Sequence, residues 1–346
     1  MEKNNEDGAT PRSAHEAATA FTNAYVVLVA SSAKTADEGL LAPRTARQNV
    51  VLTLPEGGVI SVCPFIDDFE KDVENSYLSS RASIFQERLL ARRSIFFTSS
   101  QVYWQCHQDT RAETLTKIAC PTSDTNQKRI FSLSFPELWF TQFPLYRVYQ
   151  PIYERYSKLK LTRETDRALA FQNIEFRISQ IFIVIGKFGM FFDSSELCRS
   201  LLWRREGTET SLKRIDYQGF QSPPPTWSWA AYKGAIGYFD LPTDGIIWGN
   251  VQHANVRNSH VAVDSILIAE TYHYDTSQLS DILYDCIDNE KGRLKGMANG
   301  TAYYLLIVGT KGPNKDGDGT WERLGVAYSE DPNLFSNKET ERVSIS

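Results

Sequence analysis

The sequence has few cysteines, and their spacing excludes two structural roles. Its 346 residues contain five cysteines, an odd number, and no two of them form a CxxC pair. A disulfide framework and a cysteine zinc site both need paired or clustered cysteines. We therefore expect no metal site and a reducing, cytoplasmic environment for this chain.

Targeting and membrane segments are also missing. The N-terminal stretch MEKNNEDGATPRSAHE lacks the apolar region of a secretory signal. No uninterrupted apolar run approaches the length of a membrane span. The formal net charge is -5, whereas a nucleic-acid binder carries a basic excess. The sequence thus predicts neither a membrane nor a nucleic acid as partner.

Catalytic motifs are absent as well. The chain has no P-loop, no dinucleotide fingerprint, no GxSxG elbow and no HExxH pair. Cys106 and His107 form the one pair that resembles a nucleophile with its base. Neighbours on a strand point to opposite faces, so the two side chains would not meet. We therefore predict no catalytic residue and no cofactor, and interpret Cys106 as a core residue beside Trp104.

Residue periodicity predicts the elements of the first third of the chain. Residues 13–22 favour a helix with Ser13 as its N-cap and Glu16 completing a capping box. Residues 25–31 are apolar on both faces, which is typical of a strand buried in a parallel sheet. Strands are predicted on either side of a turn at 55–58. A helix over 80–92, with Ala82 and Phe85 on one face, precedes a hairpin of strands 94–97 and 101–106.

The remainder is predicted to be helical and then rich in strands. Residues 136–203 are mostly helical, with Thr162 capping one helix. Beyond three prolines, Trp227 and Trp229 alternate with Thr226 and Ser228, which favours a strand with both indoles buried. Further strands are predicted at 245–250, 261–270, 301–308 and 322–328. The class is therefore α+β, with an expected division into a disordered segment 1–12, a first domain 13–120, a helical region 121–222, a β-rich domain 223–330 and a flexible tail 331–346.

Four polar residues stand among apolar neighbours and are candidates for a shared site. They are Arg81, Gln86, Glu87 and Glu113. Arg81 and Glu87 are six residues apart and cannot pair directly on one helix turn, so each needs a partner elsewhere. Because buried polar groups must find partners, we expect the four side chains to lie close together. A structural network is the simpler hypothesis, and a ligand site is the alternative.

Several ordered fragments resemble the fungal heterokaryon-incompatibility (HET) family. The Arg81 to Arg93 run carries the Gln-Glu and Leu positions of the family pattern, although Ser83 stands where the family has Trp and Ala91 where it has Ser. An aromatic strand and Glu113 follow, as in that family. The family's two opening segments have no counterpart here. The fragments that carry the resemblance are residues 21–25, 30–33, 39–44, 81–93, 101–106, 156–157, 161–162 with Asp166, 201–203, 225–230 and 321–325.

The resemblance implies a remnant of an α/β, TIR-like HET domain that lacks its N-terminal part. It marks Trp104, Cys106, Trp203, Trp227 and Trp229 as core positions. It also implies a role in non-self recognition and regulated cell death, with other incompatibility factors as protein partners. We expect a non-catalytic, truncated or degenerate interaction protein. Two alternatives stay open: an NAD-cleaving TIR-like effector completed by a partner chain, and a gene product whose missing segment is encoded upstream.

Overall fold

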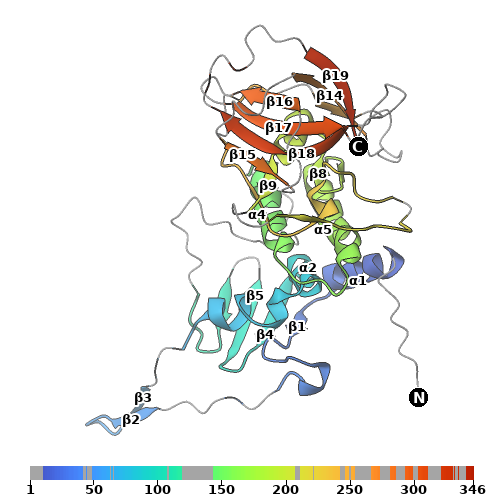
Figure 1. The fold of residues 1–346 in the computed structure, drawn as a ribbon. Coiled ribbons are helices and arrows are strands. Elements are labelled where there is room, and N and C mark those ends of the chain that lie inside the picture. The colour runs from blue at the N-terminus through green and yellow to red at the C-terminus, as the bar shows by residue number, and fades with distance from the viewer. Residues whose placement is uncertain are drawn as a thin grey trace, which may run out of the picture. The chain divides into compact units, whose positions relative to one another are not determined.

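A computed structural model shows a chain of mixed helices and strands (Figure 1), which confirms the α+β class. The chain divides into two compact units, one of residues Arg12–Pro136 and one of Glu137–Ser346 with Met1–Pro11. The boundary predicted between residues 222 and 223 falls inside the second unit. The structure describes residues 11–41, 44, 49–62, 64, 66–106, 109–118, 143–206, 211–220, 222–241, 246–248, 251–253, 266–272, 281–285, 293–298, 303–310, 321–329, 331, 334 and 340–346.

The first unit is built on a small sheet in the strand order β1-β4-β5-β6. Strand β1 runs parallel to β4, as predicted, and the other pairs are antiparallel. The elements of this unit are α1 (Pro11–Asn23), β1 (Val27–Val29), η1 (Ala36–Glu38), β2 (Val50–Thr53), β3 (Val59–Val62), the π-helix η2 (Glu70–Glu74), η3 (Leu78–Ser80), α2 (Ala82–Leu90), β4 (Arg93–Phe97), β5 (Val102–Cys106) and β6 (Thr110–Ala112).

One face of this sheet holds the core of the first unit. Val29, Phe96, Tyr103 and Ala112 pack there with Val73. The prediction that β1 is buried on both faces is wrong, because β1 lies at the edge of the sheet and Leu28 is 52% exposed. The predicted Ser13 cap is also wrong, since α1 begins at Pro11 and Ser13 lies within it. Residues 1–10 of the expected disordered segment lie outside the described residues.

The helices of the second unit confirm the predicted helical middle. They are α4 (Leu145–Ser157), η4 (Glu164–Asp166), α5 (Arg167–Phe182) and α6 (Ser194–Ser200), with the short strands β7 (Gly186–Lys187), β8 (Met190–Phe191), β9 (Trp203–Arg205), β10 (Lys213–Arg214), β11 (Tyr232–Lys233) and β12 (Ile236–Tyr238). The N-cap of α5 is Asp166 rather than Thr162, because the turn η4 precedes the helix. Gly186 lies in β7 and Gly189 in the turn of the β7–β8 hairpin, which follows α5.

A seven-stranded sheet makes up most of the C-terminal part. Its order is β13-β14-β16-β17-β18-β15, and β19 pairs with both β14 and β18. The strands are β13 (Val251–His253), β14 (Leu267–Tyr272), β15 (Asp281–Tyr284), β16 (Arg293–Ala298), β17 (Tyr303–Thr310), β18 (Trp321–Ser329) and β19 (Thr340–Ile345). The predicted strands 301–308 and 322–328 are confirmed as β17 and β18, whereas residues 261–265 lie outside the described residues.

Two predictions about this part are wrong. Residues 331–346 were expected to form a flexible tail, but Thr340–Ile345 is β19, which buries Val343 and Ile345 by strand alternation. Residues 226–229 do not form a strand. Ser228 is instead the N-cap of the 3-10 helix η5 (Trp229–Ala231), and its hydroxyl accepts from the amide of Ala230. A side chain that bonds to nearby backbone competes with a strand ladder, which explains the turn.

Candidate functional site

The predicted polar residues on and before α2 divide by exposure. Arg81 is exposed at the N-cap of α2, and Gln86 and Glu87 are half-buried within the helix. Burial raises the pKa of Glu87 to about 7, and the nearby positive charge of Arg81 opposes that rise. This is a charge effect and not an ion pair, so it does not contradict the prediction that the two side chains cannot pair directly.

Glu113, the fourth predicted residue, takes its partners from another part of the unit. Its carboxylate accepts from Arg44 at 2.5 Å and from the backbone amide of Val102 at 3.1 Å. Its own amide donates to the carbonyl of Val102. The structure thus brings Glu113 to β5 and to the 39–44 fragment. The expected four-residue cluster is divided between α2 and this strand.

The side chains of β5 that were predicted to be buried are not the ones that the structure buries. Trp104 and Cys106 are half-buried, and the fully buried residue of β5 is Tyr103, which directly precedes Trp104. The prediction that Trp104 and Cys106 belong to the core is therefore wrong, although Phe85, at 3% exposed, does. Cys106 is a free thiol, and His107 lies outside the described residues.

A polar network that sequence reasoning missed fixes the segment after β3 to this sheet. The hydroxyls of Tyr103 and Ser100 both donate to Asp72, which lies in the π-helix η2. The amide group of Gln101 donates to Asp67 at 2.8 Å and to the Tyr103 hydroxyl at 2.9 Å. The only sequence signal was the polar pair Ser100-Gln101 before an aromatic strand.

This network holds two segments together by hydrogen bonds and does not form an acid–base pair. Burial, followed by the bond to Asp72, raises the pKa of Tyr103 to about 12. Tyr103 therefore stays protonated at neutral pH and donates its hydrogen bond, so it does not serve as a base. Gln101 is fully buried, and its Oε1 has no hydrogen-bond partner in the described part of the chain.

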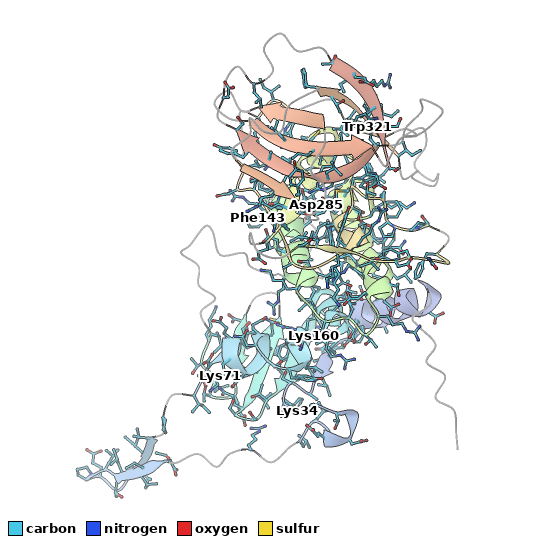
Figure 2. All side chains as sticks on the ribbon, in the orientation of Figure 1. Lys34, Lys71, Phe143, Lys160, Asp285 and Trp321 are labelled. Carbon is cyan, nitrogen blue, oxygen red and sulfur yellow. The ribbon has the colours of Figure 1, made fainter. Side chains whose placement is uncertain are left out.

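Three of the distant motif fragments meet at Arg323 in the second unit. Arg323 is buried on β18 and forms an ion pair with Asp285, which follows β15, at 2.7 Å. Its guanidinium also donates to the carbonyls of Leu201 and Trp203. Figure 2 labels Asp285 where the sheet meets the helices of the same unit. The guanidinium carbon lies 3.5 Å from the centre of the Trp203 ring, a cation–π contact.

The fragment 225–230 joins the same cluster. The backbone amide of Arg323 donates to the Thr226 hydroxyl, and that hydroxyl donates to the carbonyl of Ser346 beside β19. The indole of Trp203 donates to the carbonyl of Trp227 at 2.9 Å. Residues 201–203, 225–230 and 321–325 are thus parts of one buried assembly, which we call the Arg323 node.

Aromatic side chains confirm the predicted burial of the three motif tryptophans. Trp203, Trp227 and Trp229 are all 0% exposed. Ring centroids of Phe171 and Tyr153 lie 4.8 and 5.4 Å from that of Trp229. Such tilted and edge-on pairs stabilise a core beyond the burial of their area.

A buried carboxylate on α5 holds the β7–β8 hairpin against this aromatic core. Glu175 accepts from the amide of Gly189 at 2.6 Å. Burial raises the pKa of Glu175 to about 8, although hydrogen bonds from the hairpin amides and the charge of Lys187 lower it. Gly189 has a φ of +78°, and an added Cβ would lie 2.3 Å from the indole nitrogen of Trp229. The hairpin is therefore closely fitted, and Glu175 has a structural partner.

A second carboxyl group with a raised pKa, that of Glu196, lies on α6 beside Arg199, whose guanidinium contacts two aromatic rings. Burial raises the pKa of Glu196 to about 7, and the charge of Arg199 opposes that rise. Arg199 itself is buried and lies 4.1 Å from the ring centre of Tyr146 and 5.0 Å from that of Trp248. The carboxylate and the guanidinium here are surrounded by aromatic rings, which is typical of a packed interior.

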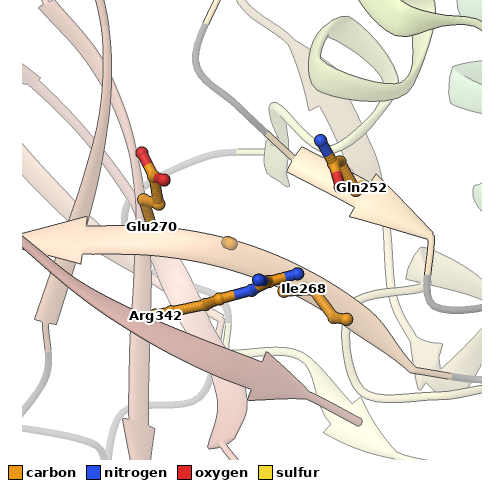
Figure 3. Close-up of a pocket in the computed structure, with 5 residues that line it drawn as sticks. Gln252, Ile268, Glu270 and Arg342 are labelled. Carbon is orange, nitrogen blue, oxygen red and sulfur yellow. The ribbon is translucent and has the colours of Figure 1, made fainter.

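A shallow hollow lies on the sheet at β13, β14 and β19 (Figure 3). It holds about 90 Å³ and is lined by Gln252, Ile268, Ala269, Glu270 and Arg342. Glu270 and Arg342 are register partners on adjacent strands, and both are exposed. Sites for small molecules and cofactors enclose roughly 300–1,000 Å³. This hollow is therefore too small for a dinucleotide.

Among the residues that the structure describes, no group of three or more His, Cys, Asp or Glu side chains could hold a metal ion. None of the helices found there combines the length and the apolar character needed to cross a bilayer. Comparison with family models, with curated proteins and with solved structures finds no match to this chain.

Proposed function

We propose that this chain is a HET-like protein of fungal non-self recognition. It contacts other incompatibility factors in the cytoplasm and performs no catalysis. The observation that carries the proposal is the Arg323 node, because three fragments that carry the resemblance bond to one another there, across up to 122 positions of sequence. Fragments that meet in one core support a common origin better than isolated matches would.

The contact between Arg44 and Glu113 supports the same proposal in the first unit. It joins the fragment 39–44 to the acidic residue that follows the aromatic strand, over 69 positions of sequence. Both residues belong to the resemblance. The resemblance is therefore supported in each of the two units by a contact between fragments far apart in sequence.

The environment of the motif carboxylates favours an interaction protein over a hydrolase. A glycoside-type cleavage of NAD needs a carboxylate that faces the reacting carbon and donors placed where charge develops. Glu113 is instead bonded to Arg44 and to the β5 backbone, and Glu87 lies on a packed helix with a pKa raised to about 7. The partners of Glu113 account for its position in the structure.

An incompatibility assay tests this function directly. One of two otherwise identical fungal strains expresses the chain from an inducible promoter, and dead cells in the fusion zone are counted by dye uptake. We expect expression to change hyphal survival, and we expect Glu87→Gln to behave like the wild-type chain. Unchanged survival would contradict the proposed function. A Glu87→Gln chain that folds normally and yet loses the effect would favour the enzyme alternative.

A further inference from the structure

The β2–β3 hairpin of the first unit (Figure 1) carries an apolar surface that none of the described residues covers. Its register sets Val50 opposite Val62 and Leu52 opposite Ile60, and residues directly opposite each other in a sheet share a face. Leu54 extends this face beside Gly58. We call the set Val50, Leu52, Leu54, Ile60 and Val62 the apolar hairpin face; these side chains are 42–62% exposed.

The opposite face of the hairpin is mixed in character. It carries Val51, Thr53, Val59 and Ser61, and the Asn49 side chain donates to the Ser61 hydroxyl at 2.8 Å. This alternation of an apolar and a partly polar face is the pattern of a sheet that buries one side. A two-stranded hairpin is only marginally stable by itself in water. The apolar hairpin face therefore gains stability when a second layer covers it.

We propose that a second copy of this chain covers the apolar hairpin face, so that two hairpins pack face to face about a two-fold axis. No charged residue lies in β2 or β3, and an uncharged apolar face is complementary to itself. Glu56, at the turn, is the one charge in residues 49–62. An axis perpendicular to the strands keeps the two Glu56 tips apart, which favours an antiparallel arrangement of the hairpins.

The area of this face sets the strength of the association. The exposed fractions of its five side chains correspond to roughly 450 Å² per copy, similar to the larger apolar patches on monomers. Two copies bury about 900 Å², which is below the ~1,200–2,000 Å² of stable interfaces. The dimer is therefore weak and depends on protein concentration. Two hairpins could also pair through their strand edges, but that arrangement leaves the apolar faces in water. Face-to-face packing buries those faces and is therefore the more stable arrangement.

Sedimentation velocity of the full chain tests the inference, which does not depend on the proposed function. Across about 1–100 µM protein we expect a shift from monomer to dimer. Leu52→Lys and Ile60→Lys should each weaken association by at least about tenfold, because a buried lysine lacks a partner. Thr53→Lys, on the mixed face, is the matched control and should leave association unchanged.

Three outcomes would overturn the inference. The first is a wild-type chain that stays monomeric throughout the range. The second is association that survives Leu52→Lys and Ile60→Lys or is lost with Thr53→Lys. The third is a lower melting temperature of the monomeric Leu52→Lys chain relative to Thr53→Lys, since that result would mean that the hairpin docks on its own chain.

Discussion

Removing the partners of the Arg323 node one at a time should destabilise the second unit in a strongly non-additive way. Arg323→Met leaves Asp285 buried without its counter-ion, and it leaves the carbonyls of Leu201 and Trp203 without a donor. Breaking a buried ion pair costs about 3–5 kcal/mol. Each unpaired carbonyl adds about 1–3 kcal/mol. Together these terms approach the whole stability of a typical domain.

The double variant Arg323→Met with Asp285→Leu separates the charge from the carbonyls. It removes both charges and leaves only the two unpaired carbonyls, so its expected loss is about 2–6 kcal/mol. The double variant should therefore be more stable than Arg323→Met alone. Asp285→Asn, which retains an acceptor for the guanidinium, should lose about 3 kcal/mol.

Urea unfolding at pH 7, followed by tryptophan fluorescence, measures these differences in the free energy of unfolding. The signal reports mainly on the second unit, because Trp104 is the one tryptophan of residues 12–136. With the single variant Asp285→Leu included, a double-mutant cycle gives the coupling of Arg323 to Asp285. Losses that simply add would refute the reasoning, since they would mean that the two charges do not interact in the folded chain.

Two further predictions concern the β7–β8 hairpin. Because burial raises the pKa of Glu175 from 4.5 in the unfolded chain to about 8 in the folded one, the native state holds an extra proton between these values, and stability should fall as pH rises through that window. The free energy of unfolding should fall by up to about 1.4 kcal/mol per pH unit, and Glu175→Gln should reduce this slope. Melting curves recorded from pH 5 to 8 measure the slope for both chains. An equal slope in the two chains would contradict the assignment. Gly189→Ala should cost more than the ~1–2 kcal/mol of backbone strain, because its Cβ would lie 2.3 Å from the Trp229 indole. Gly219→Ala is the control, with a φ of +85° and no atom within 4 Å of the new Cβ, so equal losses from the two substitutions would show that the close fit to Trp229 is not real.

Periodicity predicted burial better than it predicted backbone conformation. The alternation of Trp227 and Trp229 indicated a strand, and both indoles are indeed buried. The backbone instead turns into η5, because the Ser228 hydroxyl bonds to the Ala230 amide and to the Phe188 carbonyl. Local side-chain bonds of this kind are not visible in an apolar pattern.

The sequence of the C-terminal strand β19 has strand periodicity, but its polar composition led to the prediction of a flexible tail. Residues 340–346 are mostly polar, so they resembled a tail. Val343 and Ile345 nevertheless alternate with exposed Arg342 and Ser344 in β19, which is strand periodicity. By contrast, nothing in the sequence indicates that Arg323 pairs with Asp285, 38 positions away, because such contacts are set by the tertiary fold.

The candidate polar site was predicted only in part, for a geometric reason. Arg81, Gln86 and Glu87 lie on or directly before α2, whereas Glu113 bonds to Arg44 and to the β5 backbone. The network of Asp72, Gln101 and Tyr103 was missed because its members come from a π-helix and a strand that are adjacent only after folding. Polar character in the sequence identified residues that need partners but did not identify the partners.

NAD hydrolysis by the purified chain tests the central proposal, that this chain acts without catalysis. The full chain is incubated with NAD, and released nicotinamide is measured by chromatography against a heat-killed control. We expect no release above that control, for the wild-type chain and for Glu16→Gln, Glu87→Gln and Glu113→Gln alike. Turnover by the wild-type chain that is lost in one of these folded variants would contradict it and would identify that carboxylate as catalytic.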